Sequence, residues 1–161
     1  MRLENKIAVI TGAGSGFGKG IAIRFAAEGA KVVIADINLE SAEKVVAEIG
    51  EAAIAIEGDV SQDGDVLSMF ERTLKHFGRV DILVNNAGTT HRNKPMTEVT
   101  EEEFDQIFAV NVKSVFLTAK HGVPLMKKQG HGVILNVAST AGLRPRPGLA
   151  WYNTSKGAMI T

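Results

Sequence analysis

The sequence predicts an α/β fold, in which a doubly wound parallel sheet is covered by helices on both faces in three layers. Three observations predict it. Short β-branched runs alternate with longer stretches of helical periodicity. The short runs are apolar on both faces, as buried parallel strands are. The connections between them are long enough for the crossovers that parallel strands require.

The expected elements follow in chain order from periodicity and helix-stop signals. A helical stripe after the second run ends at Gly50, and the stripe after the third run ends at Gly78. Residues 100–129 predict two consecutive helices, with Pro124 bending or interrupting the second. The expected strands are Ile7–Thr11, Lys31–Asp36, Ala52–Glu57, Ile82–Asn85 and Val133–Val137.

Composition excludes several classes of protein. The chain has 161 residues, which suits one domain, and 18 basic side chains balance 18 acidic ones. This balance gives no electrostatic reason to expect nucleic acid or a membrane surface as a partner. The absence of cysteine excludes disulfides and zinc ribbons, and the four histidines lack metal-ligand spacing, so no metal is expected. Because the first six residues are too polar to open a signal peptide, a soluble cytoplasmic protein is expected.

A glycine-rich turn follows the first expected strand and precedes a helical segment. Residues 11–18 read Thr-Gly-Ala-Gly-Ser-Gly-Phe-Gly. Glycine permits positive φ, close approach of the backbone to a pyrophosphate, and tight packing of helix on strand. The helix N-terminus then offers free N–H groups to phosphates. A plain tight turn is the alternative, but the strand-to-helix position favours nucleotide binding in a Rossmann-type sheet.

The second expected strand ends at Asp36, where a carboxylate would accept hydrogen bonds from both hydroxyls of a ribose. It would also repel the 2′-phosphate of NADP. No Arg or Lys follows at Ile37 or Asn38, and Ser15 in the glycine turn is uncharged. NAD is therefore expected and NADP is disfavoured. The alternative role for Asp36 is that of a helix N-cap, although Asn38 can serve there.

Three further signals are each weak alone. Tyr152 and Lys156 lie four positions apart, which places them on one face of a helix if the segment is helical. A nearby cation favours the phenolate form of a phenol, so such a pair can exchange a proton with an alcohol or carbonyl oxygen, although a surface pair is the commoner explanation. Ser139 follows the fifth expected strand, where α/β proteins place ligands, or it simply forms a turn. Asn111 lies inside a helical pattern, where asparagine is disfavoured unless it faces solvent or bonds back to the helix.

Together these motifs resemble the short-chain dehydrogenase/reductase family. The order matches throughout, and so does the spacing of 13 positions between Ser139 and Tyr152. The likeness is greatest to the 3-oxoacyl-carrier-protein reductase and glucose dehydrogenase group. The motifs that carry it are Thr11-Gly12-x-x-x-Gly16-x-Gly18, Asp59, Asn85-Asn86-Ala87-Gly88, Asn111, Ser139 and Tyr152-x-x-x-Lys156.

The resemblance implies an NAD-dependent oxidoreductase that interconverts a secondary alcohol and a ketone. Tyr152 would be the acid/base, and Lys156 would lower the pKa of that phenol and bind the nicotinamide ribose. Ser139 would hydrogen-bond the substrate oxygen, while Asn111 would bend its helix and hold a water that relays protons to Lys156. The implied cofactor-binding residues are Gly12, Gly14, Ser15, Gly16, Phe17, Gly18, Asp36, Ile37, Asp59, Val60, Asn86, Ala87, Gly88, Tyr152 and Lys156.

The resemblance also implies what lies beyond the chain. Family members continue past the Tyr-x-x-x-Lys helix, so the sequence is interpreted as one domain, 1–161, incomplete at its C-terminus and lacking the last strands and helices. The fifth strand would then be an exposed edge. A homo-oligomer, a tetramer at full length, is implied. The alternative function is a non-catalytic nucleotide-binding fragment or inactive truncated product.

The residues 144–147, Arg-Pro-Arg-Pro, are interpreted as an exposed loop, with a contact to an anionic substrate as the alternative.

Overall fold

The computed structural model describes residues 1–161 and contains one five-stranded sheet in the order β3-β2-β1-β4-β5. Every pair of neighbouring strands is parallel. The strands are β1 (Ile7–Thr11), β2 (Lys31–Asp36), β3 (Ala53–Glu57), β4 (Ile82–Asn85) and β5 (Val133–Asn136). The helices are α1 (Gly16–Ala27), α2 (Leu39–Ile49), α3 (Asp63–Phe77), α4 (Glu101–Phe108), α5 (Ser114–Gln129) and α6 (Ala150–Ile160).

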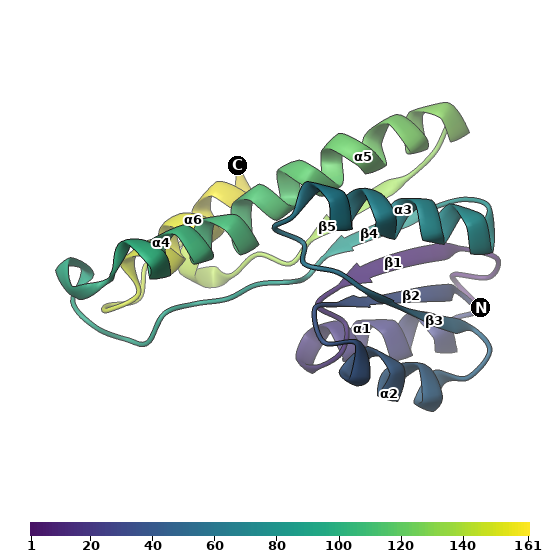
Figure 1. Ribbon diagram of the computed structural model, residues 1–161, viewed down its shortest axis with the longest axis horizontal. Coiled ribbons are helices and arrows are strands. Elements are labelled where there is room, and N and C mark those ends of the chain that lie inside the picture. Colours follow the sequence, from purple (N-terminus) through teal and green to yellow (C-terminus); the bar gives the residue numbers. More distant parts are fainter.

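The sheet is the middle of three layers, as Figure 1 shows. Helices α1 and α2 cover one face, where Ile10, Ile34 and Val45 belong to one apolar cluster. Helices α3 and α5 cover the other face, where Val9 and Phe70 belong to a second cluster. Adjacent residues of β1 thus point into different layers, which is why this strand is apolar at every position. The α/β prediction is confirmed.

Helix ends agree with the sequence signals. The Asn38 side chain accepts a hydrogen bond from the Ser41 amide at 2.9 Å and caps α2, so Asp36 is not the N-cap of that helix. Gly78 ends α3 in the left-handed conformation, with φ 80°. Two strand boundaries move by one residue: β3 begins at Ala53 rather than Ala52, and β5 ends at Asn136 rather than Val137.

The long segment after β4 differs from the prediction in where it is interrupted. Pro124 lies inside α5, which runs unbroken from Ser114 to Gln129. The regular helix changes instead at a π-helical segment, Ala109–Lys113, that joins α4 to α5 and contains Asn111. Such segments are rare and are frequently found at functional sites.

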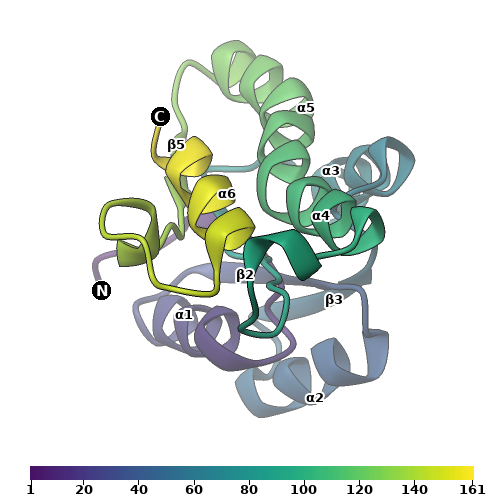
Figure 2. The ribbon, with the colours of Figure 1, turned by 90° about the vertical axis from the view of Figure 1, so that its left-hand side faces the viewer.

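Helices α4 and α6 lie beyond the carboxyl ends of the strands (Figures 1 and 2). The ring of Phe104 in α4 meets Trp151 in α6 edge-on, with centroids 5.2 Å apart. The loops before these helices also pair, since the Lys94 amide donates to the Gly148 carbonyl at 3.1 Å. These contacts fix α6 over the edge of the sheet where ligands bind in open α/β folds.

Candidate active site

The glycine turn presents the start of α1 to a groove at the carboxyl edge of the sheet. Ser15 is the N-cap of α1 without a side-chain cap, and the first turn carries no acidic residue. The first amides of the helix therefore retain both their hydrogen-bonding capacity and the positive end of the helix dipole. Gly12 has φ +61°, and a Cβ there would lie 2.8 Å from the Cα of Ala87, so only glycine fits.

Asp36 is held at the end of β2 by two backbone amides. The Gly14 amide donates to Oδ2 at 2.8 Å, and the Asn38 amide donates to Oδ1 at 3.0 Å. The carboxylate is thus fixed between the glycine turn and α2. Ile37 beside it is 68% exposed, so an apolar side chain stands open at this end of the groove.

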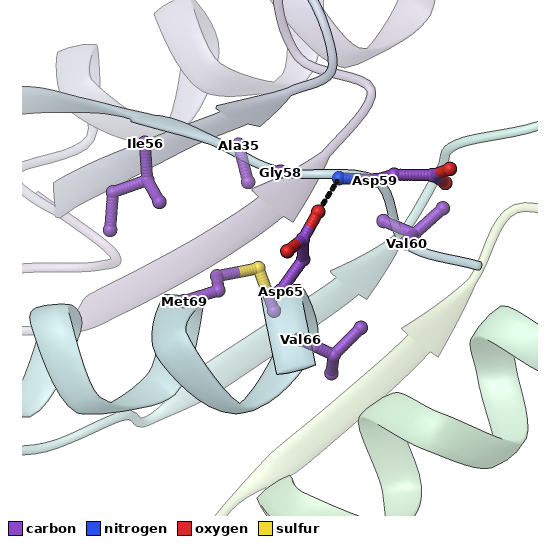
Figure 3. Close-up of a pocket in the computed structure, with 8 residues that line it drawn as sticks. All are labelled: Ala35, Ile56, Gly58, Asp59, Val60, Asp65, Val66 and Met69. Atoms are coloured by element: carbon purple, nitrogen blue, oxygen red, sulfur yellow. Dashed lines mark hydrogen bonds between the residues drawn. The ribbon is translucent and has the colours of Figure 1, made fainter. Parts of the chain in front are cut away.

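A small hollow below the loop after β3 is lined mainly by apolar side chains, including Val60 and Met69 (Figure 3). The carboxylate of Asp65, in the first turn of α3, points up at the loop and accepts a hydrogen bond from the Asp59 amide at 2.9 Å. The Asp59 carboxylate accepts one from the Ser61 amide at 2.9 Å. These bonds fix the loop that carries Asp59 and Val60.

The groove itself has a volume of about 440 Å³. It is lined by residues from the four loops that follow β1, β2, β3 and β4, and by residues of α1, β2, α4 and the π-helical segment. Gly14 and Gly18 do not line it. Gly14 packs against Asp36, and Gly18 packs against the Gly12 carbonyl and the Asn86 side chain. The groove is lined by Gly12, Ser15, Gly16, Phe17, Asp36, Ile37, Gly58, Asp59, Val60, Asn86, Ala87, Gly88, Thr89, Gln106 and Val110.

The segment after β4 is bound to the glycine turn by side-chain hydrogen bonds. Asn86 Nδ2 donates to the carbonyls of Thr11 and Gly12 at 2.8 and 3.0 Å. The Thr11 hydroxyl oxygen accepts from the amides of Asn86 and Ala87, both at 3.1 Å. Thr11 and Asn86 therefore fix the floor of the groove, where β1 and β4 end side by side.

Asn111 is fully buried in the π-helical segment and its side-chain amide is satisfied within the protein. Its Oδ1 accepts from the Thr89 amide at 2.8 Å, and Nδ2 donates to the Thr89 carbonyl at 2.9 Å. Nδ2 also donates to Ser155 Oγ in α6 at 2.9 Å. The solvent-facing alternative for Asn111 is therefore wrong.

Tyr152 lies in the first turn of α6, and Lys156 lies in the middle of that helix. Lys156 is 5% exposed, and its ammonium donates to the Val137 carbonyl at 3.0 Å. Burial lowers the pKa of Lys156 below its ordinary value. Ser139 caps a 3₁₀ turn, its hydroxyl oxygen accepting from the Ala141 amide at 3.1 Å. Ser139, Tyr152 and Lys156 together line a second hollow of about 310 Å³.

The two hollows are adjacent parts of one cleft. Four residues line both of them: Phe17, Asn86, Gly88 and Thr89. A Cβ at Gly88 would lie 3.3 Å from Asn111 Oδ1 and 3.4 Å from Lys156 Nζ, which places all three groups side by side. The cleft therefore runs from Asp36 at one end to Tyr152 and Ser139 at the other.

The family follows from this arrangement together with the family model for short chain dehydrogenases, which matches residues 6–161. The chain belongs to the short-chain dehydrogenase family. The Rossmann-type sheet and the assignment of the chain to an oxidoreductase family are thereby confirmed.

Individual relatives of this short-chain dehydrogenase are similar over nearly its whole length. The chain is 47% identical to the 4-formylbenzenesulfonate dehydrogenase of Comamonas testosteroni, over 99% of the chain and 65% of the relative. It is 52% identical to a 3-ketoacyl-(acyl-carrier-protein) reductase of Brucella melitensis complexed with NADH, with a TM-score of 0.96. An NAD⁺-bound xylitol dehydrogenase is 33% identical with a TM-score of 0.95.

Coverage is unequal in these comparisons. The two solved structures are matched over 98% and 99% of this chain, but over only 66% and 63% of their own chains. The chain therefore spans about two thirds of the length of the proteins it resembles.

Two residues of the site have roles that the sequence analysis missed. Thr89 binds Asn111 through both its amide and its carbonyl, and Ser155 accepts the remaining Asn111 hydrogen bond. A helical pattern that places Ser155 between Tyr152 and Lys156 was the only signal available.

Two kinds of feature are absent from this structure. No group of three or more His, Cys, Asp or Glu side chains is arranged to hold a metal ion. None of its helices combines the length and the apolar character needed to cross a membrane.

Proposed function

We propose that this short-chain dehydrogenase uses NAD to interconvert a secondary alcohol and a ketone, with Tyr152 as acid/base. The observation that carries the proposal is the continuity of the cleft. One end holds the carboxylate of Asp36, and the other end holds the side chains of Tyr152 and Lys156.

The residues of the cleft fit a dinucleotide. The uncapped N-terminus of α1 suits the pyrophosphate, because its amides and dipole favour an anion. The fixed carboxylate of Asp36 suits the two hydroxyls of the adenosine ribose and opposes a 2′-phosphate. Asp59 and Val60 would contact the adenine, and Asn86, Ala87 and Gly88 would pass beneath the cofactor. When bound, the nicotinamide would supply the hydride acceptor or donor.

The protein's own contribution would be a proton and its placement. The Tyr152 hydroxyl would exchange a proton with the substrate oxygen, and Ser139 would donate a hydrogen bond to that same oxygen. The Lys156 ammonium would stabilise the Tyr152 phenolate, and its burial strengthens that interaction because few waters screen it. Asn111 would hold the loop at Thr89 against the helix that carries Tyr152.

The substrate proposal rests on the named relatives. A 3-ketoacyl-(acyl-carrier-protein) reductase and a xylitol dehydrogenase both resemble this chain in sequence and structure. Polyols and 3-hydroxyacyl thioesters are therefore the first candidates.

The test is an absorbance assay of NADH formation and consumption on the protein expressed from its complete reading frame. The panel contains polyols, 3-hydroxyacyl thioesters and their ketones, each offered with NAD and with NADP. We expect turnover of at least one secondary alcohol with NAD. Dinucleotide binding without turnover of any alcohol or ketone would favour the non-catalytic alternative.

A further inference from the structure

We propose that Ser155 is a positioning residue, which holds Tyr152 and Lys156 in register with Asn111; the proposal rests on the proposed function of these three side chains. Ser155 lies between Tyr152 and Lys156 in α6 and has no exposed surface. Its hydroxyl oxygen accepts a hydrogen bond from Asn111 Nδ2 at 2.9 Å. The same hydroxyl donates to the Tyr152 carbonyl at 2.8 Å.

No other group can take the place of the Ser155 hydroxyl as the hydrogen-bond partner of the Asn111 side chain. A primary amide has two N–H groups and one oxygen. The oxygen and one N–H are bonded to the backbone of Thr89, and the second N–H is bonded to Ser155. Since Asn111 is fully buried, water cannot replace the Ser155 hydroxyl. Loss of that hydroxyl would leave a buried N–H without a partner, which costs more than the hydrogen bond itself.

The hydrogen bond joins two elements that are 44 positions apart in the chain. One is the π-helical segment, whose departure from the regular helix coincides with Asn111. The other is α6, which carries the catalytic side chains. Gly88 lies against both Asn111 Oδ1 and Lys156 Nζ, so little free space separates these groups. The Lys156 ammonium is bonded to the Val137 carbonyl, which lies outside α6. A shift of α6 relative to Asn111 would carry Tyr152 with it while Val137 stays in place, so the ammonium would change its position relative to the Tyr152 phenol.

Serine is suited to the position because one small hydroxyl both accepts and donates. The neighbouring Thr154 offers a contrast. Its hydroxyl donates to the Ala150 carbonyl at 2.9 Å within the same helix, and it is exposed. Thr154→Ala removes a helix-internal hydroxyl without touching Asn111, so it is the matched control for Ser155→Ala.

The experiment compares wild type, Ser155→Ala, Ser155→Thr and Thr154→Ala. Tyr152 is the only tyrosine, so the ultraviolet titration of phenolate absorbance reports one side chain. For Ser155→Ala we expect a titration midpoint higher by about half a pH unit or more, because the ammonium is displaced. In a protein with turnover we expect kcat to fall about tenfold and NADH affinity to stay within about twofold. Ser155→Thr should keep the titration midpoint and the kcat of wild type, and Thr154→Ala should change neither quantity.

If folded Ser155→Ala keeps both the titration midpoint and the kcat of wild type, the proposal is overturned. It is also overturned if Thr154→Ala changes the midpoint and kcat as much as Ser155→Ala does. If Ser155→Ala does not fold, the same midpoint measured in Ser155→Cys decides, because the thiol is a weaker acceptor and should shift it in the same direction. Absence of turnover in wild type would count against the proposed function alone, since the titration needs no substrate.

Discussion

We expect Asp36 to decide the choice between NAD and NADP. Two amides hold its carboxylate at the cleft, and Ile37 beside it is exposed. Replacing Asp36 with Ala and Ile37 with Arg removes the negative charge and adds a cation. We expect the preference to shift toward NADP by tenfold or more, measured by calorimetry on both dinucleotides. Equal or tighter binding of NADP by the unmodified protein would show that Asp36 does not discriminate.

Lys156 is expected to act on Tyr152 through its charge. Its ammonium is buried and bonded to the Val137 carbonyl. Lys156→Met keeps much of the length and removes the charge, so the phenolate titration of the single tyrosine should move to higher pH. Lys113→Met, which removes the charge of a surface lysine, is the control. A midpoint that Lys156→Met leaves in place would remove Lys156 from the proposed role.

Among the residues of the candidate site, the sequence allowed us to identify those whose type and spacing belong to a motif. Asp36, Tyr152 and Lys156 could be found because each has a fixed distance from a neighbouring motif. Thr89 and Ser155 could not, since their partner Asn111 is 22 and 44 positions away. Hydroxyl and backbone contacts of that range depend on how loops and helices pack, which no local pattern records.

Among the elements, the segment between β4 and β5 was the least predictable. Proline interrupts isolated helices, so the sequence placed the irregularity at Pro124. The structure places it at Ala109–Lys113, where the buried side chain of Asn111 binds the loop at Thr89. The irregular turn thus coincides with a tertiary contact of Asn111, while α5 accommodates its proline.

The edge strand β5 carries a prediction about association. Its Val133, Ile134 and Leu135 side chains are 60%, 38% and 47% exposed, and the strand pairs only with β4. Such an edge invites pairing with a second copy. We expect residues 1–161 expressed alone to show a mass that rises with concentration in light scattering, and Val133→Lys to reduce that rise. Monodisperse monomer at high concentration would contradict this expectation.

For the whole molecule, Asp81 joins the amino ends of three neighbouring strands. Its carboxylate is 3% exposed and accepts from the Ile7 amide at 2.7 Å, from Arg79 Nε at 3.0 Å and from His131 Nε2 at 2.8 Å. Burial acts to raise the pKa of Asp81, but these hydrogen bonds outweigh it and hold the pKa below its ordinary value. The carboxylate therefore stabilises the fold at pH values at which it is ionised in both the folded and the unfolded state.

The stability of the Asp81→Asn variant tests whether the ionised Asp81 carboxylate stabilises the fold. The contribution of Asp81 is present above its unfolded pKa and is lost as the pH falls through the lower folded pKa. At neutral pH we expect the variant to lose about 2 kcal/mol of unfolding free energy in urea. The difference from wild type should shrink below about pH 4. The exposed Asp105→Asn should change stability by less than about 0.5 kcal/mol, and an equal loss there would contradict the account.

The overall architecture was the most predictable level. Runs apolar on both faces and long crossovers suffice to indicate a parallel sheet between helices, and the strand boundaries moved by no more than one residue. The sequence did not show how the groove at Asp36 joins the hollow at Tyr152. That junction depends on the packing of α6 against α4 and the π-helical segment.

We propose above that Tyr152 transfers the proton while NAD accepts the hydride from the alcohol. The most direct measurement is the rate of NADH formation by Tyr152→Phe and by wild type, in the protein expressed from its complete reading frame. We expect the rate to fall by about a hundredfold or more, because positioned acid/base groups contribute that much, while NADH binding by calorimetry stays within a few-fold. A Tyr152→Phe variant that keeps the wild-type rate would contradict the account.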